Sequence, residues 1–161
     1  MIKSIRRQKA AIVLRDDLIE YYKKLKEQLK IKYSLVDSLY TGEFEKINLI
    51  KTGAFQEADD IFIDDAEIFS KIYSADFEIT TIIDNICRIR GIDKIKFLKL
   101  FKTESHPDIT EACEIEKNIS NKLGKLLKEK EKFILNLGKE MNDVKKTINT
   151  LSDISRIRKN I

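Results

Sequence analysis

Residues 137–154 read LGKEMNDVKKTINTLSDI, and this stretch decides how the rest of the chain is interpreted. Its apolar residues recur at alternating steps of four and three, with one more at the end: Leu137, Met141, Val144, Ile148, Leu151 and Ile154. That spacing predicts a helix with a heptad stripe along one face. No proline interrupts 108–161, so the helix is predicted to reach roughly 80 Å at 1.5 Å per residue. A chain of 161 residues cannot cover such a helix, and part of the stripe is expected to bind a partner.

Composition favours helix over sheet. Apolar residues make up 42% of the chain and charged residues 36%, with only five glycines and one proline. The predicted class is all-α: an antiparallel helical hairpin or bundle with a long C-terminal helix of coiled-coil character. The net charge of +4 arises from 31 basic and 27 acidic residues and is nearly balanced. No apolar run is long enough for a membrane span and no signal peptide is predicted, so a cytoplasmic location is expected.

Helix boundaries follow from apolar periodicity and from the positions of glycine and proline. One α-helical domain is predicted over residues 1–161, with helices at 10–40, 43–52, 54–90, 92–102 and 107–158. The break after the first helix is placed at Thr41-Gly42, because glycine tolerates the left-handed conformation of a helix end. The two turns that follow, up to Gly53, are either a short helix or a kinked continuation of the first. Gly91 is expected to end the 54–90 helix. Ser105 or Thr103 is predicted to cap the last helix, with Pro107 in its first turn.

Residues with catalytic or metal-binding chemistry are few and scattered. His106 is the sole histidine and is interpreted as a surface or capping residue. A metal-carboxylate bundle uses a Glu-x-x-His pair from each of two helices, which a chain with one histidine cannot provide. The carboxylate stripe on the 54–90 helix is therefore interpreted as a solvated face: Glu57, Asp60, Asp64 and Glu67. Cys87 and Cys113 are expected to be reduced core residues. No phosphate loop or nucleophile elbow occurs, so we predict no enzyme activity, cofactor or metal.

Two basic clusters leave a nucleic-acid partner open. They are the N-terminal Lys3, Arg6, Arg7 and Lys9 and the later Lys122, Lys125, Lys128, Lys130 and Lys132. Glu129 and Glu131 are interleaved with the second cluster, which favours a solvated helix face over a phosphate-binding surface.

Three features of layout occur together between Leu14 and Leu151. The first is a long helix ending in a glycine-containing turn near Thr41-Gly42 or Lys51-Thr-Gly53. The second is an amphipathic helix closing with Ile89-Arg-Gly91, and the third is the heptad helix after Pro107. In this layout the chain resembles the FlgN family of flagellar type III export chaperones. The resemblance implies a cytoplasmic chaperone that binds the terminal helix of hook–filament junction proteins and keeps them unpolymerised for export.

The seam, defined as Leu137, Met141, Val144, Ile148, Leu151 and Ile154, is the predicted partner-binding site. An amphipathic client helix laid on such a seam buries its own apolar face. The same residues could instead pack within the chain or form a homodimeric coiled coil without a client, and these alternatives stay open beside the less favoured nucleic-acid-binding module.

Overall fold

The computed structural model describes the backbone of residues 2–159 and the side chains of residues 15–156. It contains the four helices α1 (Ile2–Thr52), α2 (Phe55–Arg90), α3 (Lys94–Phe101) and α4 (Pro107–Lys159). No strand occurs among the described residues. The all-α prediction is therefore confirmed, and the predicted ends of the 54–90, 92–102 and 107–158 helices lie within two residues of the observed ones.

The predicted helix end at Thr41-Gly42 is wrong, because α1 is one helix through this point. Positive φ angles occur at Gly53 and Gly91, and not at Gly42. Gly42 instead faces α2, where a Cβ atom in its place would lie 3.5 Å from side-chain atoms of Ile61 and Asp65. Packing between the two helices thus stabilises the helical conformation at Gly42, and α1 ends at Thr52, directly before Gly53.

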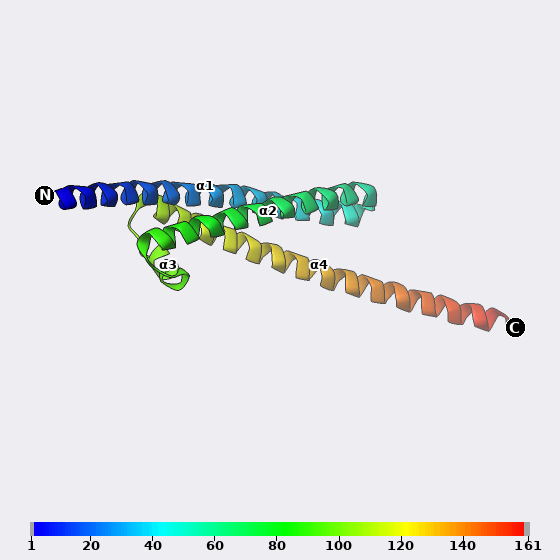
Figure 1. Cartoon of the computed structure of the whole chain (residues 1–161). Helices are drawn as coiled ribbons and strands as arrows, with labels where there is room; N and C mark the ends of the chain where they lie inside the picture. Colours follow the sequence, from blue (N-terminus) through cyan, green and yellow to red (C-terminus); the bar gives the residue numbers. More distant parts are fainter. Residues whose placement is uncertain (1, 160–161) are drawn as a thin grey trace. The chain divides into compact units, whose positions relative to one another are not determined.

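Helices α1 and α2 lie side by side as an antiparallel hairpin (Figure 1). The turn is short, since the Ala54 amide donates to the Leu49 carbonyl at 2.9 Å while Gly53 takes a φ of 79°. At the other end, Gly91 caps α2 with a φ of 64°. The Asp93 side chain then accepts a 2.7 Å hydrogen bond from the Lys96 amide and begins α3.

The chain divides into two compact units, Met1–Leu123 and Gly124–Ile161, where the sequence predicted one domain over 1–161. The first unit holds the hydrophobic core. Its buried members come from all four helices: Tyr22, Leu25, Leu29, Val36, Ile82, Ile86, Cys87, Phe97, Ile109, Ala112 and Ile119. Within this unit the early turns of α4 run parallel to α1, because Lys26 pairs with Asp108 and Lys122 pairs further along with Asp37.

His106 has the capping role that the sequence left open for it, and Ser105 and Thr103 do not. The Asp108 amide donates to His106 Nδ1 at 3.3 Å in the first turn of α4. The imidazole also contacts the Tyr22 ring edge-on, with centroids 5.1 Å apart. The Thr103 hydroxyl instead donates back to carbonyls at the end of α3. The loop before α4 is thereby fixed to α1.

Candidate functional site

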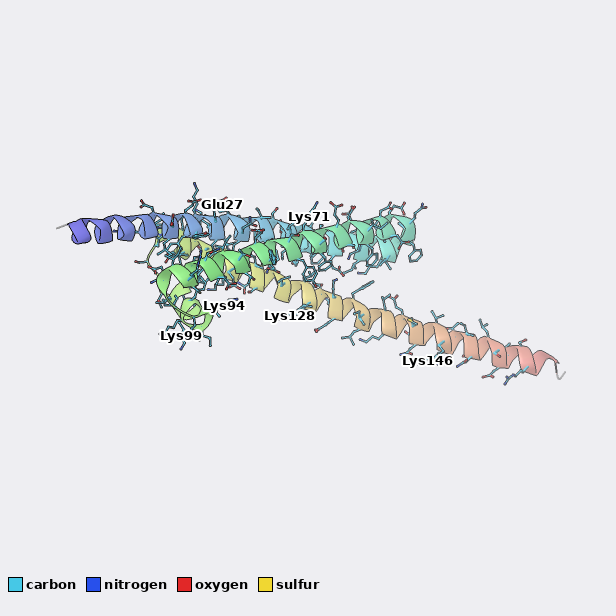
Figure 2. The ribbon with its side chains drawn as sticks, in the orientation of Figure 1. Glu27, Lys71, Lys94, Lys99, Lys128 and Lys146 are labelled. Atoms are coloured by element: carbon cyan, nitrogen blue, oxygen red, sulfur yellow. The ribbon has the colours of Figure 1, made fainter. Side chains whose placement is uncertain are left out.

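The predicted partner-binding residues lie on the part of α4 that forms the second unit. Five seam residues, Met141, Val144, Ile148, Leu151 and Ile154, are exposed, with exposed fractions between 45% and 72%, and Leu137 is half-buried. Side chains along this part of α4, including Lys146, point outward from the ribbon (Figure 2). Isolated exposed apolar residues are ordinary, but four at heptad spacing, with Ile154 one turn beyond them, are typical of an interaction surface.

The seam continues a face of α4 that is buried in the first unit. Ile119 and Leu137 are 18 residues apart, which is about five turns at 3.6 residues per turn. Ala112 and Ile148 are separated by about ten turns on the same count. Ala112 and Ile119 are core residues, whereas Ile148 is exposed. One continuous helix face is therefore filled in one segment and exposed in the next.

The charged residues of 137–154 lie beside the apolar stripe or opposite it, and none interrupts it between Leu137 and Leu151. In the heptad that places Met141 and Ile148 at a positions, Glu140 falls at g and Lys145 at e. Lys125, Lys132, Lys139 and Lys146 repeat every seven residues at f, opposite the apolar stripe. Lys146 pairs with Asp143 on its own helix at 4.0 Å. The stripe itself is uncharged from Leu137 to Leu151.

Lys122, which the sequence grouped with a solvated basic face, has a structural role instead. Its ammonium donates to the Asp37 carboxylate and lies 4.9 Å from the centroid of the Tyr33 ring. The hydrogen bond to Asp37 raises the pKa of Lys122, although partial desolvation opposes the shift. This lysine therefore ties α4 to α1.

The acidic stripe on α2 is exposed, as interpreted from its spacing. Glu57, Asp60, Asp64 and Glu67 face solvent, and Glu67 pairs with Lys71 at 2.6 Å. Among the described side chains, no group of three His, Cys, Asp or Glu residues has the arrangement of a metal site. Cys87 is buried and Cys113 is half-buried, and both are free thiols. Burial raises the pKa of the Cys87 thiol, which disfavours the thiolate.

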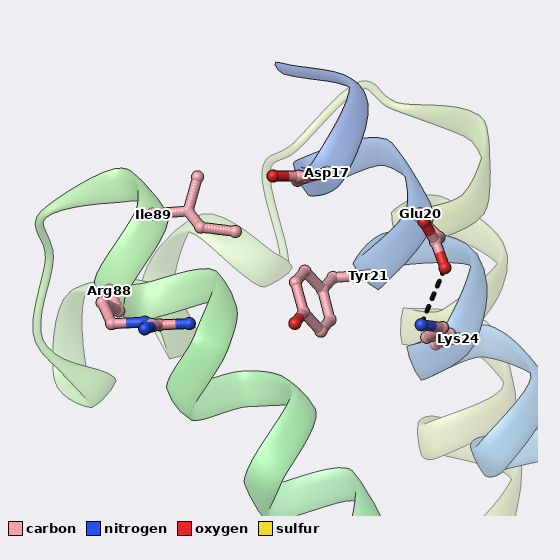
Figure 3. Close-up of a pocket in the computed structure, with 6 residues that line it drawn as sticks. All are labelled: Asp17, Glu20, Tyr21, Lys24, Arg88 and Ile89. Atoms are coloured by element: carbon pink, nitrogen blue, oxygen red, sulfur yellow. Dashed lines mark ion pairs between the residues drawn. The ribbon is translucent and has the colours of Figure 1, made fainter. Parts of the chain in front are cut away.

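A cleft of about 500 Å³ lies between residues 17–24 of α1 and the last turn of α2. Its lining residues are Asp17, Glu20, Tyr21, Lys24, Arg88 and Ile89 (Figure 3). Glu20 and Lys24 pair at 2.7 Å, one helical turn apart. The hydrogen bond from Lys24 lowers the pKa of Glu20, so this carboxylate is a poor proton donor near neutral pH. The cleft thus resembles an ordinary solvated helix surface.

Sequence reasoning missed the interactions that hold the helices together. Arg90 Nη1 donates to the Tyr22 hydroxyl at 2.8 Å and to Glu104 at 2.7 Å, linking α2, α1 and the loop before α4. Lys46 of α1 is buried and pairs with Glu43 and with Asp65 of α2. These residues stand among other charged residues in the sequence, and nothing local distinguishes the ones that pair between helices.

None of the described helices holds a segment with the length and apolar character needed to cross a bilayer. No protein-family model, curated protein or solved structure matches the chain.

Proposed function

We propose that this protein is a chaperone-type binding module that holds an amphipathic helix of a client protein on the seam of α4. The observation that carries the proposal is an exposed heptad row: Met141, Val144, Ile148 and Leu151. Nearer the N-terminus of α4, Ala112 and Ile119 of the same helix face lie in the hydrophobic core. A helix of the client would place its apolar side chains between those of the seam.

The size of the seam is sufficient for a specific complex. Complete burial of an aliphatic side chain contributes about 1.5–3 kcal/mol, so the six seam residues alone contribute on the order of 10 kcal/mol. This is comparable with the 4–15 kcal/mol that association costs in lost freedom of motion. The seam therefore supports a reversible complex of moderate affinity. Met141 is flexible and polarizable, which allows it to fit different client side chains.

The resemblance in layout to the FlgN family suggests the class of client. We propose the terminal helices of hook–filament junction proteins, which expose apolar faces before assembly, and a cytoplasmic site of action. The long hairpin of α1 and α2 and the long α4 after Pro107 support this assignment as features of layout. Binding would keep the client helix from self-association until export.

A second copy of the chain is the alternative occupant, and one feature favours it. In a parallel two-stranded coiled coil, a g residue lies near the e residue five positions later in the partner. Glu140 and Lys145 hold these positions, so each chain would contribute to two attractive pairs. Such a homodimer needs no client.

The test compares three forms of the full chain. The variant Met141→Glu/Ile148→Glu places two carboxylates on the seam, and Asn142→Glu/Asn149→Glu adds the same charge on a neighbouring face. Fluorescence anisotropy with labelled C-terminal segments of junction proteins measures binding, and light scattering measures the oligomeric state. We expect the seam variant to bind more than 10-fold more weakly, because one desolvated charge costs over 1.4 kcal/mol, and the control to bind normally.

Equal binding by all three forms would place the client elsewhere on the chain. A stable dimer that only the seam variant dissociates, with no affinity for any junction segment, would instead establish the homodimer. Circular dichroism of each variant verifies that helix content is unchanged.

A further inference from the structure

The first unit contains an apolar cavity of about 530 Å³ beside α3 that the seam does not involve. Its apolar walls come from three helices and include Leu25 and Leu29 of α1, Ile79 and Ile83 of α2, and Ile95 and Leu98 of α3. The volume lies in the range of ligand-binding pockets, and apolar walls with a few polar groups are typical of them.

The sequence of α3, KIKFLKLF, explains how the cavity acquires its outer wall. Phe97 is buried in the core and anchors the helix. The steps from Ile95 to Leu98 and from Lys99 to Lys102 are three residues, and those from Ile95 to Lys99 and from Leu98 to Lys102 are four. The four residues therefore lie on a common face. All four line the cavity. This face therefore combines apolar and cationic side chains.

The charge around the cavity is mainly positive. Lys99 and Lys102 line it, and neither forms an ion pair with any described residue. Lys94, by contrast, pairs with Asp84 of α2 at 2.9 Å. The ribbon with side chains shows Lys94 and Lys99 extending from α3 (Figure 2). The single acidic lining residue, Glu116 of α4, accepts a hydrogen bond from Ser120 at 3.0 Å. Two cations thus remain for an anionic ligand.

The exposed fractions of the outer wall indicate whether a ligand lies wholly inside the cavity or also covers the outer surface of α3. Ile95 and Leu98 line the cavity, yet their exposed fractions are 68% and 57%. The apolar surface therefore extends from the cavity onto the outside of α3. A ligand that covers both must have an extended apolar face, as an amphipathic helix does. A small amphiphile inside the cavity would leave the outer apolar surface in water.

We propose that this cavity and the adjoining face of α3 bind an acidic amphipathic helix of a protein partner. Apolar side chains one turn apart on that helix enter the cavity, and its Asp or Glu residues pair with Lys99 and Lys102. The site is separate from the α4 seam and does not depend on the function proposed for the seam.

The test uses a defined probe: a fluorescein-labelled 15-residue peptide with leucine on one helical face and glutamate on the other, and the same peptide with lysine for glutamate. The full chain is compared with Lys99→Glu/Lys102→Glu, with Leu98→Asp, and with the charge-matched control Lys125→Glu/Lys132→Glu on α4. Fluorescence anisotropy measures affinity. We expect the acidic peptide to bind about 10-fold more weakly to the α3 double variant, since two attractions become repulsions, and within twofold of normal to the control.

Leu98→Asp is expected to weaken binding as well, because it places a carboxylate among the leucines. The proposal is overturned if the α3 and control variants lose affinity equally, if the lysine peptide binds as well as the acidic one, or if Met141→Glu/Ile148→Glu abolishes binding and thereby places the peptide on the seam. It is also overturned if dodecanoate binds the cavity while the acidic peptide does not, since the occupant is then a lipid-like anion. Circular dichroism verifies folding of each variant.

Discussion

Lys46 of α1 donates a 2.5 Å hydrogen bond to Asp65 of α2 although its exposed fraction is only 2%. The same ammonium pairs with Glu43 at 2.8 Å and lies 4.4 Å from the centroid of the Phe62 ring. Desolvation acts to lower the pKa of Lys46, but the hydrogen bonds to Asp65 and Glu43 outweigh it and the pKa is raised. One buried cation therefore joins the two helices near the turn of the hairpin.

Replacing this lysine leaves two buried carboxylates close together. We expect Lys46→Met to lower the free energy of unfolding by about 3–5 kcal/mol, because breaking a buried ion pair leaves uncompensated charge. Urea denaturation followed by circular dichroism measures the change. The double variant Lys46→Met/Asp65→Leu removes one charge of each sign and is expected to recover part of the loss. A single variant as stable as the parent chain would show that the pair adds nothing to the hairpin.

Two isoleucines of α4 test the difference between its buried and exposed segments. Ile119 is 3% exposed and Ile148 is 59% exposed. We expect Ile119→Ala to cost about 2–5 kcal/mol of unfolding free energy, since it opens a cavity in the core. Ile148→Ala is expected to change it by less than about 0.5 kcal/mol, as surface substitutions do. Chemical denaturation of both variants checks the contrast, and equal costs would mean that Ile148 is buried in solution.

Glycines 42 and 53 are predicted to respond oppositely to alanine. Gly42 lies inside α1, and an added Cβ would meet Asp65 and Ile61 at 3.5 Å, an ordinary contact distance. Gly42→Ala should therefore stabilise the chain by up to about 1 kcal/mol through helix propensity. Gly53 has a φ of 79°, which alanine adopts at a cost of about 1–2 kcal/mol, so Gly53→Ala should destabilise it. Thermal melts of both variants measure these opposite shifts, and a lower melting temperature for Gly42→Ala would contradict the continuous helix.

Acidification is predicted to weaken the link between Arg90 and Glu104. The hydrogen bond from Arg90 lowers the pKa of Glu104 below its ordinary value of 4.5, and desolvation only partly opposes it. A carboxylate with a lowered folded-state pKa contributes stability above its unfolded-state pKa and loses it as the pH falls through the folded-state value. Asp108, whose pKa is lowered by the hydrogen bond from Lys26, acts in the same direction.

Stability should therefore be highest near neutral pH and fall below about pH 4.5, the region where carboxylates begin to protonate. Urea midpoints between pH 7 and pH 3 measure the decline. Glu104→Gln removes one of the responsible groups, so its midpoint should be lower at pH 7 and should depend less steeply on pH. An unchanged slope in this variant would assign the acid sensitivity to other carboxylates.

Local signals in the sequence predicted most helix ends correctly. Gly91 ends α2 because glycine readily adopts the left-handed conformation found there. Pro107 begins α4 because the fixed φ of proline suits the first turn of a helix. The α3 cavity was not predicted, since its walls come from helices distant in the sequence. The only feature of the sequence that points to this cavity is the spacing of Lys99 and Lys102 from Ile95 and Leu98.

The sequence by itself determined that the chain is helical, where three of its four helices lie, and that residues 137–154 carry an apolar seam. These properties depend on periodicity and on residues within a turn or two of one another. Only the tertiary structure decided that α1 continues through Gly42, that Lys46 pairs with Asp65 19 residues away, and that Lys122 reaches Asp37 across 85 residues. The physical reason is that burial and ion pairing depend on partners brought together by packing, and they outweigh local preferences of about 1 kcal/mol such as that of glycine in a helix.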